Sequence, residues 1–439
     1  MSGPKTSEYT LTPEQRANLN AQNRCDSSIL ACIERIKSLE DQLSISMGSV
    51  QIYDDYGNDE SIALTNGLKA KMLEIEKLKK ELSDRFDALS GYQRSGIVTI
   101  SEGELSRKKA ILEKLKAIRS DVTELLKEIE ICSKQSKDLK AQISSDIQEN
   151  LGGSFDLSWE TPETPHAPSV KDSIISVLTD LLSNTTLSSE LTIRIQNAIE
   201  KANNINNDDF LKNFSAVTVK SIVDECREYI KSMELYGAEF EELEAEYMVL
   251  CSELHIAPKK FIISESGITE LKAEITKLET ELLEASEQEY IADAIDEVME
   301  EMGYALIGSR EVTKKSGKRF RDELYTFSEG TAVNIRYDNQ GRIAMELGGI
   351  DATDRLPSQS EAAKLEDEMV VFCDMFTELE RRLAEKGIIC KNRISHLPAK
   401  AEYAQIINTS DYEMTKEVET IKTGRGSTKG ENKKQRRNE

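Results

Sequence analysis

The sequence predicts a mainly α-helical protein, in which coiled-coil and helical-bundle segments are followed by a small C-terminal α+β domain with an antiparallel meander. Three observations predict this fold. Apolar residues recur at alternating spacings of three and four over several long stretches, as in helices that pair through a heptad seam. Charged residues make up 31% of the 439 residues and aromatic residues only 5%, which suits long helices with narrow apolar faces. Residues 331–349 instead alternate apolar and polar side chains around the turn sequence DNQG, which predicts a β-hairpin.

Residues 13–150 are expected to form N-terminal coiled-coil helices. Pro13 after Thr12 suits the start of a helix, because the first turn leaves its N–H groups unpaired and proline has none. Ser101 and Glu104 have the spacing of a capping box and predict another start. The three predicted seams are Cys25, Ile29, Cys32, Ile36, Leu39, Leu43; then Leu68, Met72, Ile75, Leu78, Leu82, Phe86, Leu89; then Ile111, Leu115, Ile118, Val122, Leu125, Ile129, Cys132, Leu139 and Ile143. The spacing leaves open whether they pair within one chain or between chains.

A proline-rich linker is expected over residues 151–170. Pro162, Pro165 and Pro168 prevent a helix from continuing through this stretch. The segment is interpreted as an exposed spacer or, alternatively, as a short linear motif that docks on a partner with Trp159 as its anchor.

A helical bundle is predicted over residues 171–257, and an acidic coiled-coil arm over residues 258–288. The arm carries the seam Ile268, Leu271, Ile275, Leu278, Leu282 and Ala285. From Glu234 to Glu301 there are 20 acidic and 4 basic residues, a local net charge of −16, within a chain whose net charge is −23. Such charge disfavours general binding of nucleic acids and favours basic partners or solubility.

Residues 289–398 are expected to form a compact α+β module. A broad apolar helical stripe ending at Gly303 precedes four short strands, and Ser358 with Glu361 forms a second capping box. The helix it opens carries the seam Leu365, Met369, Phe372, Phe376, Leu379 and Leu383. Residues 388–396 are predicted to add an edge strand. We expect both helices to cover one face of the sheet and water the other. Residues 415–439 are predicted to be a disordered basic tail.

Motifs for catalysis are not found in the sequence. It contains no phosphate-binding loop, nucleophile elbow or zinc-protease motif, and its three histidines are far apart. Cys251 and His255 have metal-ligand spacing, but no second pair accompanies them. We therefore expect no enzymatic activity, no cofactor and no metal. An enzyme would need a pocket in the module lined by groups such as those of Tyr304, Arg336, Asp338 and Glu346.

The seven cysteines are scattered, and no pair is spaced as C-x-x-C. Because the sequence shows no export signal and no run of about 20 apolar residues, we expect a cytoplasmic protein with reduced thiols and no membrane span.

Residues 310–321 form one basic segment that interrupts the acidic pattern. Its six basic residues against the single acid Glu311 give a net charge of +5: Arg310, Lys314, Lys315, Lys318, Arg319 and Arg321. A basic loop between two strands suits contact with a phosphate backbone or an acidic partner surface. The other interpretation is a solvated loop that balances the acidic arm.

These patterns favour a non-enzymatic scaffold or adaptor. It is predicted to self-associate as a homo-oligomer through its heptad seams and to dock a protein partner through the α+β module. The alternative is a nucleic-acid-associated accessory protein that uses residues 310–321 and the basic tail.

Overall fold

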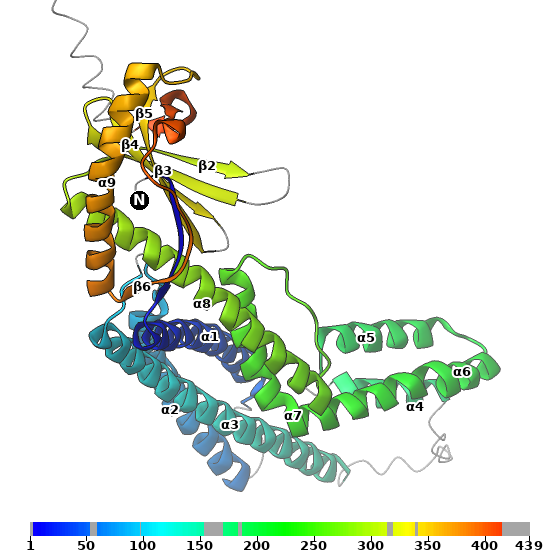
Figure 1. Cartoon of the computed structure of the whole chain (residues 1–439). Coiled ribbons are helices and arrows are strands. Elements are labelled where there is room, and N and C mark those ends of the chain that lie inside the picture. Colours follow the sequence, from blue (N-terminus) through cyan, green and yellow to red (C-terminus); the bar gives the residue numbers. More distant parts are fainter. Residues whose placement is uncertain are drawn as a thin grey trace, which may run out of the picture. The chain divides into compact units, whose positions relative to one another are not determined.

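A computed structural model describes residues 3–52, 59–96, 98–152, 170–182, 187–313, 319–338 and 341–414. The fold is mainly α-helical, with an antiparallel sheet built largely from the C-terminal part of the chain, as the sequence predicts (Figure 1). The chain forms two compact units. The helical unit comprises the described residues of Asn23–Arg94 and Leu105–Leu282, and the sheet unit those of Met1–Gln22, Ser95–Glu104 and Leu283–Glu439.

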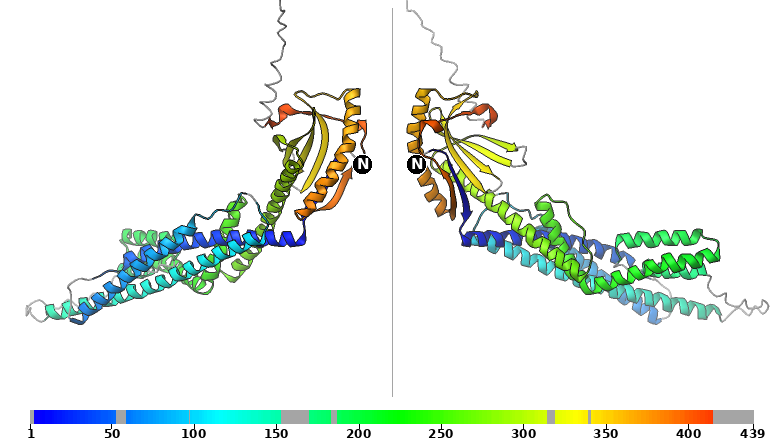
Figure 2. Two further views of the ribbon diagram at one scale, coloured as in Figure 1. Left: turned by 90° about the vertical axis from the view of Figure 1, so that its left-hand side faces the viewer. Right: turned by 45° about the vertical axis from the view of Figure 1, so that its right-hand side comes forward.

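Three long helices that lie side by side form one part of the helical unit (Figures 1 and 2). They are α1 (Pro13–Ser49), α2 (Asp59–Ser90) and α3 (Glu102–Gly152). The starts predicted at Pro13 and after Ser101 are confirmed. Their seams share a single core: Ile29, Cys32, Ile33, Ile36, Leu39, Leu43, Leu68, Met72, Ile75, Leu82, Phe86, Leu115, Ile118, Val122, Leu125, Ile129 and Cys132. Leu78, predicted for the second seam, is exposed instead. The seams are therefore buried against one another within one chain.

Shorter helices precede the long helix α7 in the second part of this unit. They are α4 (Val170–Leu182), α5 (Ser189–Asn204), α6 (Asp208–Phe214) and a π-helical turn (Ser215–Val219), and α7 spans Lys220–Glu253. The second half of α7 packs on α8 (Glu265–Glu301), where the predicted seam from Ile268 to Leu282 is buried against Phe240, Tyr247 and Leu250. This seam also finds its partner within the chain.

The sheet unit contains eight strands among the described residues, in the order β6-β1-β5-β4-β3-β2-β8, with β7 parallel to β5. The strands are β1 (Lys5–Leu11), β2 (Leu306–Thr313), β3 (Arg319–Ser328), β4 (Thr331–Asp338), β5 (Arg342–Asp351), β6 (Ile388–His396), β7 (Ile406–Asn408) and β8 (Glu413–Met414). The predicted meander corresponds to β2–β5. Gly341 closes the β4–β5 hairpin with φ 73°, a value that a residue with a Cβ rarely adopts.

Strand β1 was not predicted, and it lies between β5 and β6. Buried and partly buried positions alternate along it, as in other strands with one covered face, but two of the buried residues are polar, Lys5 and Ser7. The Lys5 ammonium lies 4.0 Å from the ring centroid of Phe376, and the Ser7 hydroxyl is 3.0 Å from Nε2 of His396. These partners come from distant parts of the sequence, so the sheet extends beyond the expected module of residues 289–398.

One face of the sheet is covered by α9 (Gln359–Glu385) and the Leu283–Glu301 part of α8, and Figure 2 shows α9 running along it. The capping box of Ser358 and Glu361 is confirmed. The apolar side chains that meet there include Ile295, Val298, Tyr325, Val333, Ile335, Met345, Met369, Phe372, Phe376, Leu379 and Leu383. The opposite face was expected to contact water. Part of it is covered instead by the C-terminal segment, where Ile407 and Tyr412 pack on Ile307, Leu324 and Ala332.

Several predictions concern residues that lie outside the described part of the chain. They are the linker around Trp159, the hairpin tip with Lys314, Lys315 and Lys318, and the tail of residues 415–439. Across the helices that are described, none is both long and apolar enough to cross a membrane.

Candidate functional site: the polar clusters and free edge of the sheet

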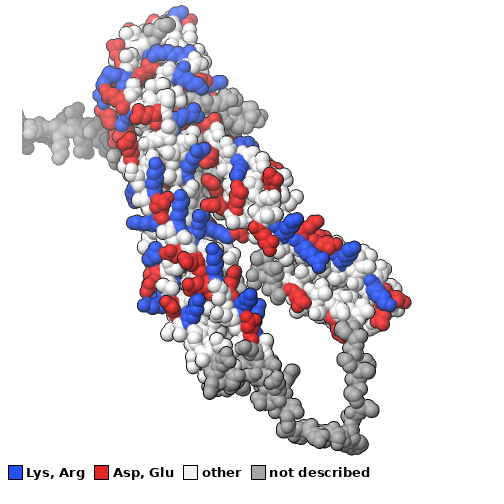
Figure 3. Space-filling model, turned by 90° about the horizontal axis from the view of Figure 1, so that it is seen from below, with Lys and Arg blue, Asp and Glu red and all other residues white. Residues whose placement is uncertain are grey.

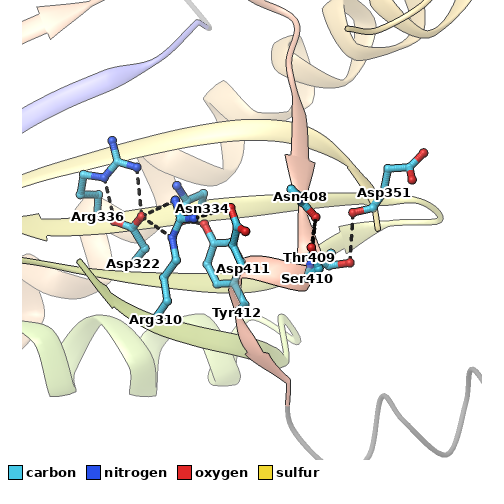
Figure 4. Close-up of polar contacts among 10 residues, drawn as sticks. All are labelled: Arg310, Asp322, Asn334, Arg336, Asp351, Asn408, Thr409, Ser410, Asp411 and Tyr412. Carbon is cyan, nitrogen blue, oxygen red and sulfur yellow. Dashed lines mark hydrogen bonds and ion pairs between the residues drawn. The ribbon is translucent and has the colours of Figure 1, made fainter. Parts of the chain in front are cut away.

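A carboxylate held between two guanidinium groups lies on the sheet face opposite the one that α9 covers (Figure 4). The strand register places Asp322 on β3 directly between Arg310 on β2 and Arg336 on β4. Nε of Arg310 donates to Oδ2 of Asp322 at 2.9 Å, and Nε of Arg336 donates to Oδ1 at 2.7 Å. The Asp322 side chain is 1% exposed. Burial alone would raise the pKa of Asp322, but the hydrogen bonds and charges of Arg336 and Arg310 hold that pKa below its usual value.

The same arginine anchors the C-terminal segment on the sheet. Nη1 of Arg310 donates to Oδ2 of Asp411 at 3.1 Å, and the guanidinium lies 4.4 Å from the ring centroid of Tyr412. The Tyr412 hydroxyl donates to Oδ1 of Asn334 at 3.2 Å (Figure 4). The acidic side chains on this face are thus neutralised by arginines, and these contacts hold the C-terminal segment on the sheet.

A second acidic cluster lies on the face that packs against α8. Consecutive strand residues point to opposite faces, so Glu323 faces away from Asp322 and towards Asp296 on α8. The Tyr325 hydroxyl donates to Oε2 of Glu323 at 3.0 Å and also hydrogen bonds to Asp296. Nε of Arg321 donates to Glu323 at 2.7 Å, and its Nη2 lies 3.3 Å from Asp296. Burial, followed by the neighbouring Glu323, raises the pKa of Asp296 to about 7.

The structure separates the residues of the predicted basic site. Arg310 and Arg321 lie on opposite faces of the sheet, and each is paired with two acidic side chains. Lys314, Lys315 and Lys318 lie outside the described residues. Arg319 lies in β3, outside the residues whose side chains are described. The described part of the segment therefore offers no surplus of positive charge.

The residues suggested for an enzymatic pocket do not converge either. Tyr304 stacks on Phe327 with 5.8 Å between ring centroids, on the side of the sheet covered by the helices. Arg336 binds Asp322, and Oδ1 of Asp338 accepts a hydrogen bond from the backbone of its own turn at 2.9 Å. Glu346 accepts one from Gln405 at 2.9 Å.

The spacing of Cys251 and His255 does not produce a shared site. Cys251 is buried, whereas His255 is exposed just beyond the end of α7 with φ 55°. In the described part of the chain, no three His, Cys, Asp or Glu side chains gather where they could hold a metal ion.

Strand β6 forms one edge of the sheet. Among the described strands β1 alone pairs with it, so its other edge has unpaired backbone groups. Its nine residues span roughly 30 Å. Ile389 and Ile394 are 42% and 45% exposed, and residues 391–393 between them are exposed as well. An open edge with exposed isoleucines suits the addition of a strand from another protein, which sequence analysis did not identify as a site.

Comparisons with protein-family models, curated proteins and solved structures give no match to this chain.

Charges of both signs alternate over the face seen in Figure 3, and no broad area of one sign is visible there. Many of these groups form ion pairs, as in the pairs of Arg381 with Glu378 and Lys272 with Glu239. The negative surplus therefore does not form one continuous field on that face, and a site for a charged partner must be argued from a particular surface.

Proposed function

We propose that this protein is a non-enzymatic scaffold or adaptor that docks a protein partner through its α+β module. The observation that carries the proposal is the free edge of β6 with its exposed isoleucines. Main-chain hydrogen bonds along such an edge provide affinity, and the alternating side chains provide specificity.

The charges of β6 indicate the chemistry of the partner. Lys391 and Arg393 are exposed on this strand, and it carries no acidic residue. Arg393 also forms an ion pair with Glu380 at 2.8 Å. Basic side chains on an edge disfavour pairing with another copy of the same strand, because the like charges repel. Arg393 is already paired with Glu380, so the exposed Lys391 is the cation that favours an extended acidic segment of a different protein.

The experiment compares proteins captured from extracts of the source cells by the full chain and by the double variant Ile389→Lys/Ile394→Lys. Leu356→Lys is the matched control, because Leu356 is 88% exposed and lies outside the sheet. We expect the double variant to lose a partner that the control retains, and binding of purified partner to weaken in the same order. Capture of the same proteins by all three chains would contradict the proposal.

Self-association remains a prediction, but it would need a surface other than the heptad seams, since these are buried within one chain. Light scattering on the eluted full chain measures the oligomeric state directly. A cytoplasmic location is part of the same proposal, and it is supported by the seven cysteines, which are all free thiols.

The nucleic-acid alternative has less support because Arg310 and Arg321 are neutralised by acids. It depends on the hairpin tip and the basic tail. Binding that weakens steeply with salt, and on charge reversal at Lys314, Lys315 and Lys318, would favour it.

A further inference from the structure

A groove of about 730 Å³ runs between α1 and α7 within the helical unit. The two helices are antiparallel there, because Ser27 contacts Glu253 while Arg35 contacts Glu241. The lining residues are Leu30, Glu34, Arg35, Ser38 and Gln42 on α1, and Glu241, Glu244, Ala245, Met248, Val249, Ser252 and Glu253 on α7. Each run covers 12 steps along its helix, so the groove is roughly 18 Å long, which is the length of about three helical turns.

The groove combines apolar and acidic groups. Met248 and the partly buried Leu30 provide apolar surface, and Met248 is 48% exposed although its neighbours on α7, Val249 among them, are buried. Methionine adapts its shape and is frequent on surfaces that bind apolar helices. The lining also contains four glutamates and a single cation, Arg35, whose charge is already paired with Glu241. Lys37 and Arg94, next to the lining, form ion pairs with Glu34 and Glu253, so Glu244 is the lining glutamate without a cation among the described residues.

One of the glutamates has no cationic partner, and another is incompletely hydrogen-bonded. Glu244 is exposed, and within the described residues no hydrogen bond or ion pair joins it to a cation. Partial desolvation of its carboxyl, followed by the charge of Glu241, raises its pKa. Glu253 uses one carboxylate oxygen, Oε2, for Arg94 at 3.3 Å, while its buried Oε1 has no hydrogen-bond partner among the described residues. A cationic ligand would stabilise both charges.

We propose that this groove binds a basic amphipathic helix of about three turns from a partner protein. Its apolar stripe would cover Met248 and Leu30, and one of its lysine or arginine side chains would reach Glu244. The surface belongs to the helical unit, so this proposal does not depend on the one made for β6.

The chain itself offers no suitable occupant. Within the basic tail of residues 415–439, residues 422–439 contain seven basic residues but no aliphatic or aromatic side chain that would cover Met248. Residues 415–421 contain Val418 and Ile421, but they carry two acidic residues against one basic residue. Residues 107–122 of α3 do have a basic amphipathic pattern, but Leu115, Ile118 and Val122 are buried in the core with α1 and α2. A second copy therefore cannot supply this helix without unfolding its own core.

The test uses the full chain and a fluorescent synthetic peptide of about 14 residues, with leucines spaced three and four apart and lysines elsewhere. A scrambled peptide of the same composition keeps the charge but has no apolar stripe. Glu244→Lys is compared with Glu234→Lys, an exposed position on the same helix outside the groove. Met248→Ser is compared with Leu235→Ser, where the leucine is 64% exposed.

We expect fluorescence anisotropy at physiological salt to show binding of the amphipathic peptide to the full chain. Glu244→Lys should weaken it about ten-fold and Glu234→Lys by less than about two-fold. Met248→Ser should weaken it about five-fold and Leu235→Ser very little. Hydrogen exchange should slow within residues 30–42 and 241–253. Equal weakening by both lysine variants, equally tight binding of the scrambled peptide, or no binding by the full chain would overturn the proposal.

Discussion

Asp296→Asn should remove a pH dependence from the stability of the sheet unit. Asp296 shares the Tyr325 hydroxyl with Glu323, and its pKa is raised to about 7 by burial and by the adjacent carboxyl. In the folded chain this carboxyl keeps its proton until the pH approaches 7, whereas in the unfolded chain it loses the proton at about pH 4. The folded state therefore binds more protons between these values, and the free energy of unfolding falls as the pH rises through this window.

The size of the effect follows from the same contacts. The pKa of Asp296 rises from 3.8 to about 7 on folding, and each pH unit corresponds to about 1.36 kcal/mol. The largest possible change in the free energy of unfolding is therefore about 4 kcal/mol. The Asp296 side chain is 31% exposed and lies 3.3 Å from the Arg321 guanidinium, so water and this cation reduce the cost of ionisation. We therefore expect about 1–2 kcal/mol.

Urea unfolding at a series of values from about pH 4.5 to about pH 7.5 measures this contribution. The free energy of unfolding of Asp296→Asn, relative to the parent chain, should rise by the expected amount across the series, because asparagine has no charge to acquire. Glu297→Gln is the matched control, since its side chain is 63% exposed, and it should follow the parent. If Asp296→Asn and the parent show parallel pH profiles, the inferred proton on Asp296 is wrong.

Four further substitutions test separate parts of the fold. Asp322→Ala leaves Arg336 without its ion-pair partner and Arg310 with Asp411 alone, and it should cost about 2–3 kcal/mol in urea unfolding. The cost is smaller than for a fully buried pair because both arginines reach water. Glu287→Ala removes the carboxylate that accepts a hydrogen bond from the Thr10 hydroxyl at 2.7 Å. The free energy of unfolding should fall by about 2 kcal/mol, and hydrogen exchange should become faster across β1. Ile129→Ala opens a cavity in the core of α1–α3 and should lower stability by about 3 kcal/mol by calorimetry. Ser358→Ala removes the N-cap of α9 and should lower the stability by about 1 kcal/mol. Ser358→Thr should keep most of this stability, because threonine also caps helices. If the stability of any of these variants is unchanged, the stabilising role assigned to the contact that it removes is wrong.

The elements that sequence analysis predicted are those whose signal is local. A heptad seam repeats over many turns, so Ile29, Ile36 and Leu43 identify their helix without knowledge of its partner. The capping box of Ser358 and Glu361 needs only four residues, and the β4–β5 hairpin only its alternation and turn. The partner helices of the seams were not predictable, because the same spacing serves contacts within a chain and between chains.

The features that were missed depend on contacts between distant residues. β1 buries Lys5 and Ser7, and only its neighbours Phe376 and His396 explain how these polar groups are accommodated. The basic segment was evaluated by counting its charges, whereas the acids that neutralise Arg310 include Asp411, about a hundred residues away. Two consecutive acidic residues within a strand were the sequence signal that could have revealed this pairing, since such residues need cationic partners when they are buried.

The two proposed docking surfaces differ in both geometry and charge, and this difference argues for an adaptor that joins unlike partners. The edge of β6 offers unpaired backbone groups beside Lys391 and Arg393, so it suits an extended acidic segment. The groove between α1 and α7 offers side chains of acidic and apolar type, so it suits a basic helix. Neither surface can serve as the occupant of the other in a second copy, because a strand bound through its backbone does not present the helical stripe that the groove requires. Acidic and basic ligands should therefore bind the full chain together, and competition between them would show that they share one surface.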